Sequence, residues 1–422
     1  MKSLADLWRL AADEFPDRTG VIHDDRPHTY RDLDAMIRAF AASLQHCVGV
    51  QPGERVALVM PNCLHSIVCY LGAIRAGAIA LPVNVRLKPE EMRFILQDAE
   101  AAAVVVHAGV WDAVREALWG VSSVRHVIGV EVEGEASVTP LDGLLRSDVD
   151  AQPSPAGPDD VAAIIYTSGT TGRPKGALIT HGNVLFNVKA AIRGHGLRPD
   201  DRHLLVVPLF HVTGLNTILP TAFHQGASVV VTSALSPREL LALIERHHVT
   251  TFFGVPTTMI LLAQTPELDR FDVGALRLIA YSGAPMPVRI IERLRRLFPG
   301  VKLHNFFGLT ETTSCTTVLP DHQALARAES IGRPVPELEL RIVDDAGHAL
   351  PSGEVGELLV KGPSVVKGYH NRPEATAEAI VDGWLHTGDT AYIDEEGYVF
   401  LRGRKKELII VGGENVYPVE VE

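Results

Sequence analysis

The sequence predicts an α/β protein in which parallel sheets are covered by helices, followed by a smaller antiparallel unit. Up to Phe307, short apolar runs alternate with segments whose apolar residues recur at helical spacing, the pattern of parallel sheets. From Ile331 the pattern changes to short runs in which apolar and polar residues alternate, divided by glycines. This pattern indicates an antiparallel, barrel-like or sandwich-like unit. A chain of 422 residues is too long for one small core, so we expect two or three packed units.

The first block of alternating elements lies between Tyr30 and His107. Its helical segments carry apolar residues at helical spacing, and its strands are short apolar runs that predict burial. The segment Asp150–Asp160, rich in Pro, Ala and Asp, has the composition of a linker to the next block. The expected helices are Tyr30–Cys47, Asn62–Ala76 and Lys88–Ala99, and the expected strands are Arg55–Met60, Ala78–Val83 and Ala102–His107.

A second block follows the linker and opens with a short apolar strand, Val161–Ile165. Helices and strands alternate again, which predicts a second parallel sheet covered by helices. Its further expected strands are Leu204–Val207, Ser228–Thr232, Thr251–Gly254, Leu276–Ser282 and Val301–Phe307, and its helices are Pro237–His247, Pro256–Ala263 and Pro287–Leu297. The antiparallel unit is expected to contain strands over Glu339–Asp344, Gly356–Lys361 and Gly397–Arg402.

Composition and charge argue against several classes of protein. A net charge of −12 lacks the basic footprint of a nucleic-acid binder, although local groups can still hold an anionic ligand. The four cysteines form no C-x-x-C pair and no metal-binding spacing, so a reducing, cytoplasmic compartment is expected. Residues Met1–Phe15 lack the apolar core of a signal peptide, and no run approaches the roughly 18 apolar residues of a membrane span.

The most informative stretch is Tyr166–Gly176, which directly follows a predicted strand. Its eleven positions hold five hydroxyl side chains, three glycines and Lys175. Such a loop offers backbone N–H groups, hydroxyl donors and a cation to one anion, and glycine lets the backbone close around phosphate oxygens. It is not a Walker A loop, because Gly169 and Gly172 lie three apart and Pro174 precedes the lysine. From composition alone, a polar surface loop remains the alternative.

The ordered string resembles the phosphate loop of the adenylate-forming superfamily, which contains acyl- and aryl-CoA synthetases, luciferases and peptide-synthetase adenylation domains. All eleven positions match that loop. The resemblance implies an enzyme that uses ATP, Mg²⁺ and coenzyme A to activate a small carboxylic acid, with Lys175 in a catalytic role. The loop residues that it assigns to the nucleotide are Thr167, Ser168, Gly169, Thr170, Thr171 and Gly172.

Two motifs at predicted strand ends extend the resemblance. In Pro208–Gly214, His211 follows an apolar strand. A lone histidine there is more often a packed structural residue, but strand ends are also where α/β folds bind ligands. The resemblance places His211 beside the acyl carboxylate and the phosphate, where it would gate the substrate rather than act as acid or base. The second motif is a generic turn by itself, and the resemblance makes it the floor shared by adenine and the acyl pocket. Its residues are Gly283, Ala284 and Pro285.

The segment Asn305–Thr312 is a weak motif in isolation, where it could be a turn into a helix with Thr310 as N-cap. The pattern of the superfamily is Asn-x-Tyr-Gly-x-Thr-Glu, and Phe307 replaces its tyrosine with a ring that can still stack on adenine. The resemblance makes Asn305 a partner of the adenine edge and Thr310 a contact to the α-phosphate. It makes Glu311 the Mg²⁺ ligand, because carboxylate oxygen suits a hard, partly hydrated cation. The nucleotide-binding set of this motif is Asn305, Phe306, Phe307 and Gly308.

Two further motifs, Thr387–Asp389 and Gly403–Ile409, would each pass for a surface turn or an ion pair by themselves. An aspartate can accept from two ribose hydroxyls, and an arginine fork can hold ribose or phosphate. The resemblance assigns Asp389 and Arg404 to the ribose and a domain hinge to Lys406. The expected division is residues 1–155 and 156–320 for two α/β subdomains, 321–405 for the antiparallel subdomain, and 406–422 for the hinge and a fragment of a C-terminal domain.

The superfamily continues past the hinge into a mobile domain that carries a second lysine. The resemblance implies that this lysine contacts the α-phosphate and the carboxylate during adenylation. The sequence stops at Glu422 without it, so we expect a truncated form that binds nucleotide but adenylates poorly. Gly412 and Gly413 would line the pantetheine channel of coenzyme A only after domain rotation.

The implied chemistry has two steps and needs no protein nucleophile. The carboxylate attacks the α-phosphate of ATP to give acyl-AMP and pyrophosphate, and the thiol of coenzyme A then displaces AMP. Members that activate α-amino acids carry an aspartate where this sequence has Thr213. No arginine is available to pair a second carboxylate, so we expect an aliphatic or aryl monocarboxylate. The pocket candidates are His211, Thr213, Asn216, Phe253, Gly254, Gly283, Phe306, Ser314 and Cys315.

Two alternative functions share these motifs. One is a ligase that loads acyl groups onto a carrier-protein phosphopantetheine, and the other is a nucleotide-binding form that is inactive because of truncation. Intact Lys175, Glu311, Asp389 and Arg404 argue against a decayed site. The expected partners are the carboxylic acid, ATP and coenzyme A, with a homodimer compatible with the sequence and with no nucleic acid or stable membrane span.

Overall fold

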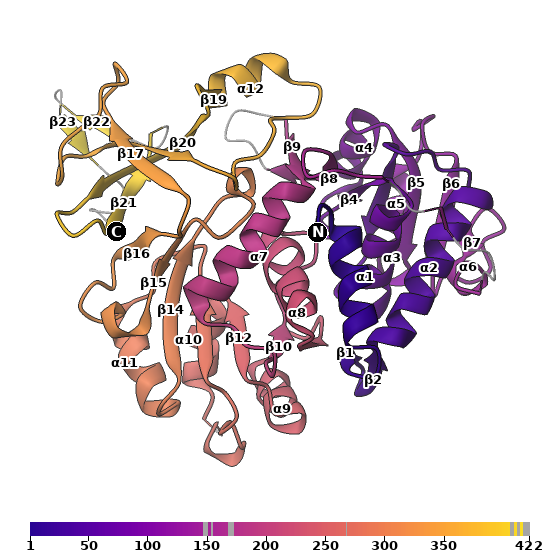
Figure 1. Cartoon of the computed structure of the whole chain (residues 1–422), viewed down its shortest axis with the longest axis horizontal. Coiled ribbons are helices and arrows are strands. Elements are labelled where there is room, and N and C mark those ends of the chain that lie inside the picture. Colours follow the sequence, from indigo (N-terminus) through magenta and orange to yellow (C-terminus); the bar gives the residue numbers. More distant parts are fainter. Residues whose placement is uncertain are drawn as a thin grey trace.

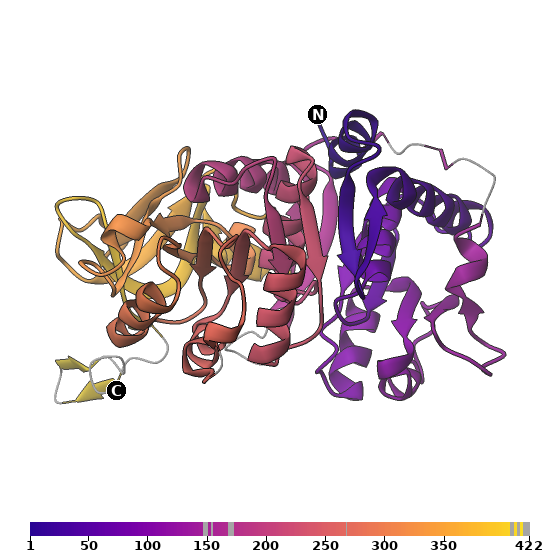
Figure 2. The same ribbon diagram turned by 90° about the horizontal axis from the view of Figure 1, so that it is seen from below.

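Two α/β units lie side by side in the computed structural model, and an antiparallel β unit extends the second of them (Figures 1 and 2). The structure describes residues 1–146, 151–152, 155–167, 173–266, 268–405, 409–411 and 414–416. The predicted linker therefore lies partly outside the described residues, and the predicted hinge Lys406 lies wholly outside them. The α-helices are α1 Leu4–Glu14, α2 Tyr30–His46, α3 Leu64–Arg75, α4 Pro89–Asp98, α5 Trp111–Ala117, α6 Leu141–Leu144, α7 His181–His195, α8 Leu219–Gln225, α9 Pro237–His247, α10 Pro256–Gln264, α11 Val288–Leu297 and α12 Pro373–Ala379.

The first sheet contains seven described strands in the order β7-β6-β5-β3-β4-β8-β9. Neighbouring strands are parallel throughout, except that β8 and β9 form an antiparallel pair at one edge. That pair flanks the predicted phosphate loop. The strands are β3 Arg55–Val59, β4 Ile79–Pro82, β5 Ala101–His107, β6 His126–Val130, β7 Thr139–Pro140, β8 Val161–Thr167 and β9 Lys175–Thr180.

The second sheet has a parallel part in the order β14-β13-β12-β10-β11-β1, closed at one edge by β2, which pairs antiparallel with β1. β1 and β2 precede the predicted boundary at residue 155 but belong to the second sheet, and β8 and β9 follow that boundary but belong to the first sheet. The division of strands between the two sheets therefore differs from the predicted division of the chain. The strands are β1 Thr19–His23, β2 Arg26–Thr29, β10 Arg202–Leu205, β11 Ser228–Val231, β12 Thr251–Gly254, β13 Leu278–Tyr281 and β14 Lys302–Phe307.

The second sheet continues from β14 into antiparallel strands in the order β15-β16-β21-β20-β18-β17, with β19 paired to β20. These strands are the orange and yellow region of Figure 1, and they confirm the predicted change from parallel to antiparallel pairing. They are β15 Thr317–Leu319, β16 Ser330–Pro334, β17 Glu339–Val343, β18 Gly356–Lys361, β19 Ile380–Val381, β20 Trp384–Ile393 and β21 Val399–Arg404. A separate pair is formed by β22 Ile409–Val411 and β23 Glu414–Val416.

Helices lie between the two sheets. Successive residues of a strand point to opposite faces of its sheet, so a strand that is apolar throughout needs both faces to be covered. Phe253 of β12 points into a core shared with the helices between the sheets, whereas its neighbour Phe252 points to the opposite face, against α9, α10 and α11. In the first sheet, Val105 faces the same shared core and Val104 faces α4 and α5. The central helices are α1, α2, α3, α7 and α8, visible between the sheets in Figure 1. This arrangement buries both faces of each parallel sheet.

The predicted elements are confirmed, with differences of at most a few residues at their ends. Pro237–His247 and Thr251–Gly254 match α9 and β12 as predicted, and Tyr30–Cys47 differs from α2 by one residue. The strand predicted over Leu204–Val207 begins and ends two residues earlier, because its pairing with β11 and β12 stops at Leu205. No helix in the described part of the chain is both long and apolar enough to cross a bilayer.

Candidate functional site

The ends of the predicted phosphate loop are held together by the β8–β9 pair. Thr167, the last residue of β8, lies opposite Lys175, the first residue of β9. The Thr167 hydroxyl donates to the Lys175 carbonyl oxygen at 3.4 Å. Both side chains are half-buried. The five loop residues between them that the sequence assigns to the nucleotide, 168–172, lie outside the described residues.

The second sheet contributes the loops that follow its parallel strands, which all end at one edge. His211 follows β10, Gly254 ends β12, Gly283 follows β13 and Phe307 ends β14. Parallel strands bring such positions together at their carboxyl ends, the common location of ligand sites in open α/β sheets. The predicted site residues of this sheet therefore share one edge, as expected.

His211 lies at this edge, in the loop that follows β10. Its side chain is exposed to solvent, yet the surrounding protein desolvates the ring and lowers its pKa, with a smaller contribution from Arg86. The imidazole is therefore neutral near pH 7. A neutral ring fits the predicted gating role better than the role of a permanent cation beside phosphate.

A tight turn follows β14 and depends on Gly308. A β-carbon at this glycine would lie 1.1 Å from the carbonyl oxygen of Ser314, so only glycine fits. The turn contains a 3₁₀ segment, Thr310–Thr312, followed by Thr313 and Ser314 with φ of 56° and 100°. Non-glycine residues rarely adopt such angles, and strained positions of this kind are concentrated at functional sites.

Glu311, in this turn, meets the end of the phosphate loop through Tyr369. The Tyr369 hydroxyl donates to Glu311 Oε1 at 2.9 Å. Lys175 Nζ lies 5.2 Å from the centroid of the same tyrosine ring, within the range of a cation–π contact. One tyrosine thus connects the predicted metal ligand of the second sheet with the predicted catalytic lysine of the first.

The segment that carries Tyr369, residues 366–370, is fixed to both sheets by its backbone. Leu178 of β9 donates to the Gly368 carbonyl at 2.9 Å and accepts from the Lys367 amide at 3.1 Å, and His370 donates to the Gly176 carbonyl at 2.8 Å. On the other side, the Val366 amide donates to the carbonyl of Glu311 at 2.9 Å. We refer to residues 366–370 as the bridging segment.

The end of β8 is anchored separately, by a carboxylate on α4. The Tyr166 hydroxyl donates to Asp98 Oδ2 at 2.6 Å, and Arg372 Nη2 donates to Asp98 Oδ1 at 2.5 Å. The Asp98 side chain is only 11% exposed. Burial and Asp98 raise the pKa of Tyr166, so its hydroxyl stays protonated and keeps donating. Arg173 adds a cation–π contact with Phe94 of α4, at 5.4 Å.

The predicted acyl-pocket residues form two groups. In one, Thr213 Oγ1 lies 3.2 Å from Ser314 Oγ, at the start of a π-helical segment, η2 Thr213–Ile218. Asn187 of α7 joins Asn216 to Cys315, because its amide donates to the Asn216 carbonyl at 2.8 Å and its Oδ1 accepts from the Cys315 backbone at 3.0 Å. This hydrogen bonding explains how two sequence-distant candidates come together.

The second group is aromatic and fully buried. Phe253 and Phe306 lie 6.1 Å apart between ring centroids, and each meets the ring of His195 edge-on. His195 Nδ1 lies 3.3 Å from His304 Nδ1. Burial, reinforced by His304, lowers the pKa of His195, so the pair is neutral. The two phenylalanines belong to the shared core, and their contact with an acyl group remains a prediction.

The adenine and ribose candidates lie on β14 and on the β20–β21 pair. Asn305 is buried and its amide donates to the Ser330 carbonyl at 3.0 Å, while Phe307 is half-buried and Gly283, Ala284 and Pro285 are exposed. Asp389 is buried and pairs with the exposed Arg404, whose Nε lies 3.1 Å from Asp389 Oδ1. The ion pair confirms their proximity, and their contact with a nucleotide stays a prediction.

Sequence reasoning missed Tyr369, Asp98 and Arg372, which organise the site from outside its motifs. A signal was present in Gly368-Tyr369, where glycine with φ of 139° allows a close approach to Thr376 of α12. The backbone of Tyr369 also donates to Thr376 Oγ1 at 2.9 Å. Asp98 carries no comparable signal, since an aspartate at a helix end is ordinary in sequence.

A divalent metal at this site would have one protein carboxylate. The described residues contain no cluster of three or more His, Cys, Asp or Glu side chains able to hold a metal ion. A half-buried carboxylate with one oxygen already hydrogen-bonded fits Mg²⁺, which keeps several waters and binds through one or two carboxylates and the phosphates of a substrate.

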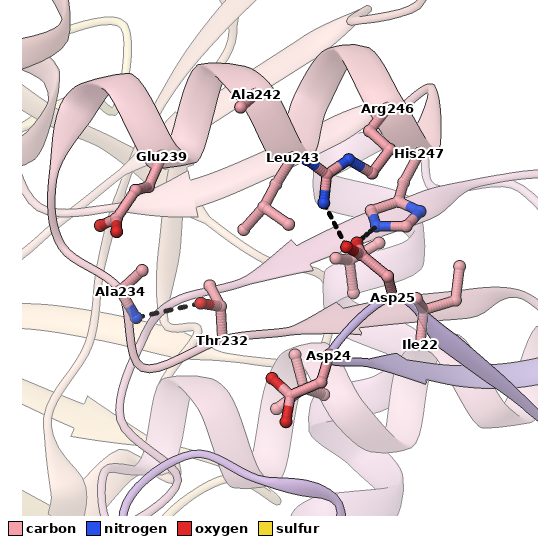
Figure 3. Close-up of a pocket in the computed structure, with 12 residues that line it drawn as sticks. Ile22, Asp24, Asp25, Thr232, Ala234, Glu239, Ala242, Leu243, Arg246 and His247 are labelled. Carbon is pink, nitrogen blue, oxygen red and sulfur yellow. Dashed lines mark hydrogen bonds and ion pairs between the residues drawn. The ribbon is translucent and has the colours of Figure 1, made fainter.

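A cavity of about 240 Å³ lies elsewhere, between α9 and the edge of the second sheet (Figure 3). None of the predicted site residues lines it. Asp25 contacts both Arg246 and His247, the latter at 2.8 Å, and Asp24 and Glu239 also line the cavity. Figure 3 shows these three side chains pointing toward each other across one end of the cavity. The cavity is therefore separate from the predicted site.

Comparison with known proteins gives matches over most of the chain. Residues 8–370 match the family described as AMP-binding enzyme. The chain is 36% identical to a feruloyl-CoA synthase of Amycolatopsis, over 96% of this chain and 79% of that protein. It is 35% identical to a long-chain-fatty-acid–CoA ligase of Salmonella typhimurium, over 100% of this chain and 80% of that protein. The crystal structure of an anthranilate CoA ligase in complex with anthranoyl-AMP superimposes with a TM-score of 0.93 at 26% identity, covering 100% of this chain and 81% of that one.

Proposed function

Since the chain belongs to the AMP-binding enzyme family and is an acyl-CoA synthetase of the adenylate-forming superfamily, we propose that it activates an aliphatic or aryl monocarboxylate. ATP supplies the adenylate and coenzyme A accepts the acyl group. The observation that supports this most strongly is the connection of Lys175 to Glu311 through Tyr369, which joins the loop of one sheet to the carboxylate of the other.

The first step faces a problem of charge, because a carboxylate must approach a polyanion. Lys175 would offset the phosphate charge from the β9 side, and Thr310 would donate to the α-phosphate from the turn after β14. Preorganised donors of this kind stabilise developing charge without reorganising during the reaction. Mg²⁺, when bound, supplies further compensation of phosphate charge, and Glu311 would hold it.

The nucleoside would lie along the second sheet toward the antiparallel unit. Asp389 would accept from the ribose hydroxyls, with Arg404 beside it as donor. Asn305 and Phe307 would contact the adenine, together with the exposed turn Gly283–Pro285. His211, whose pKa is lowered by desolvation from the surrounding protein and by Arg86, would border the carboxylate of the acid.

The proposed substrate class is based on the uncharged side chains of the residues predicted to line the acyl pocket. Thr213, Ser314, Asn216 and Cys315 are uncharged, so they offer no partner for an α-ammonium group or a second carboxylate. The similar proteins act, by name, on feruloyl, indoleacetyl and long-chain fatty acyl groups. These names support an apolar acid, aliphatic or aryl, without choosing between the two.

A screen of carboxylic acids tests the proposal. The chain is incubated at high enzyme concentration with ATP, Mg²⁺, coenzyme A and single acids, so that even slow adenylation is detected as AMP and acyl-CoA. We expect apolar monocarboxylates to yield both products, and dicarboxylates and α-amino acids to yield neither. Acyl-AMP without acyl-CoA would support the carrier-protein alternative. Failure of every acid to consume ATP would contradict the proposal.

Two expectations outside the site also remain proposals. The described cysteines are all unpaired, in agreement with a reducing compartment such as the cytoplasm. A homodimer is tested by the mass of the chain in solution, and a monomer at working concentrations would rule it out.

A further inference from the structure

We propose that Tyr369 is a positioning residue that couples the metal-binding carboxylate to the phosphate-binding lysine. The inference rests on the proposed function, because it takes Glu311 as the Mg²⁺ ligand and Lys175 as a contact to the triphosphate. It concerns a residue outside the motifs that identify the site. The geometry assigns two separate tasks to the same side chain, one to its hydroxyl and one to its ring.

The hydroxyl fixes one oxygen of Glu311. It donates to Oε1 at 2.9 Å, so this oxygen is restrained. A carboxylate that provides a single oriented oxygen suits Mg²⁺, which demands strict geometry.

The ring holds the ammonium group of Lys175 without neutralising it. Nζ lies 5.2 Å from the ring centroid, a position in which the ring quadrupole attracts the cation. Within the described residues, Lys175 and Glu311 form no ion pair with each other, although both contact Tyr369. Tyr369 thus contacts both charged groups, the carboxylate through its hydroxyl and the ammonium through its ring.

The backbone of the bridging segment makes this placement rigid. Ala177 of β9 and Tyr369 form an antiparallel bridge, and the Tyr369 amide donates to Thr376 Oγ1 at 2.9 Å. The Val366 amide donates to the carbonyl of Glu311. The backbone around Tyr369 is thus hydrogen-bonded both to β9 and to the turn that carries Glu311. The Tyr369 side chain can therefore couple the positions of these two elements.

The test is nucleotide binding by calorimetry, which needs no turnover. ATP affinity is measured with Mg²⁺ and with EDTA in the unaltered chain, Tyr369→Phe and Tyr369→Leu. Tyr369→Phe removes the hydrogen bond but keeps the ring, so we expect ATP affinity to fall roughly tenfold or more with Mg²⁺ and to change little with EDTA, given the strength of hydrogen bonds to charged groups. Tyr369→Leu should also lose about two- to fivefold with EDTA, because the cation–π contact is lost.

Tyr398→Phe is the matched control. Tyr398 also carries cations over its ring, with Arg327 at 4.2 Å and Arg333 at 4.3 Å, but it lies in the antiparallel unit and outside the predicted site. We expect this variant to bind ATP like the unaltered chain under both conditions. If Tyr369→Leu does not fold, Lys175→Gln with and without Tyr369→Phe tests whether the lysine and the tyrosine hydroxyl act together, as a departure from additivity with Mg²⁺ present.

The two levels of the proposal fail in different ways. Glu311→Gln should abolish the gain in ATP affinity that Mg²⁺ provides, and if it does not, the metal role in the proposed function is wrong. If Glu311→Gln has this effect but Tyr369→Phe retains the full Mg²⁺ gain, the positioning role alone is overturned. An equal loss with Mg²⁺ and with EDTA in Tyr369→Phe would also overturn it, since that pattern indicates general disruption of the site.

Discussion

The two parallel sheets have the same construction but contribute differently to the predicted site. The second sheet provides residues from the ends of β10, β12, β13 and β14, all at one edge. The first sheet provides only the β8–β9 pair, which lies at its own edge and departs from parallel pairing. The first sheet therefore acts as a support for one loop, and the second as the platform on which the ligand would lie.

This difference teaches that the site depends on a junction rather than on either sheet. Two contacts define the junction: Tyr369 between Lys175 and Glu311, and Asp98 between Tyr166 and Arg372. The cavity of Figure 3 lies beside α9, and none of the predicted site residues lines it. Changes at the Tyr369 contact should thus affect activity most, and changes at the Asp98 contact or inside one unit should be detected as losses of stability.

The largest expected effect comes from removing the cation at the junction. Lys175→Gln should lower the rate of acyl-AMP formation about 10²- to 10³-fold, as for the loss of one preorganised donor to a transition state. Lys367→Gln is the control, because Lys367 lies in the bridging segment but is exposed. Rates are compared in single-turnover assays with a substrate acid. Equal rates in the two variants would show that the position of Lys175 has no special role.

A steric change in the turn after β14 should lower stability. Gly308→Ala places a β-carbon 1.1 Å from the Ser314 carbonyl oxygen, so the turn must move, and we expect the free energy of unfolding to fall by about 2–4 kcal/mol. Gly143→Ala is matched to it, since nothing lies within 4 Å of a β-carbon there. Denaturant titration measures both. A stability loss below about 0.5 kcal/mol for Gly308→Ala would contradict the turn geometry.

Weakening the second junction contact should have an intermediate effect. Asp98→Asn leaves Arg372 and Tyr166 with a poorer acceptor in a site where the aspartate is 11% exposed, so we expect a loss of about 1–3 kcal/mol in unfolding free energy. Asp112→Asn removes an aspartate that pairs with Arg115 at the surface and is 90% exposed, for which at most about 1 kcal/mol is expected. Identical losses would argue against a special role for the Asp98 contact.

The effect that is smallest within a single pH unit concerns the buried histidines. Burial lowers the pKa of His203 to about 4, and burial also lowers the pKa of His195 and His304. The unfolded chain binds more protons than the folded chain below the ordinary histidine value of about 6.5, so stability should decrease as pH falls from there toward 4. Each such histidine contributes at most about 1.4 kcal/mol per pH unit. His203→Asn should flatten the pH profile measured by denaturant titration, and an unchanged slope would contradict the assignment.

The sequence alone was enough to locate the alternating strands and helices and to identify the motifs. Alternation of apolar runs located the strands and helices, because a strand buried on both faces has to be apolar throughout, as Val104 and Val105 illustrate. It could not show that β1 and β2 join the second sheet, since pairing over some 200 residues leaves no local pattern. Tyr369 was missed for the same reason: its hydroxyl partner, Glu311, lies 58 residues away.

The most direct test of the central claim, that this edge binds an acyl-adenylate, is the affinity for acyl-sulfamoyl adenosines, stable analogues of acyl-AMP. Calorimetry compares long-chain aliphatic and aryl analogues with AMP on the same chain. The account predicts that at least one apolar analogue binds about 10²-fold or more tightly than AMP, and that Asp389→Ala weakens both ligands. Analogues that bind no more tightly than AMP, or that are unaffected by Asp389→Ala, would contradict it.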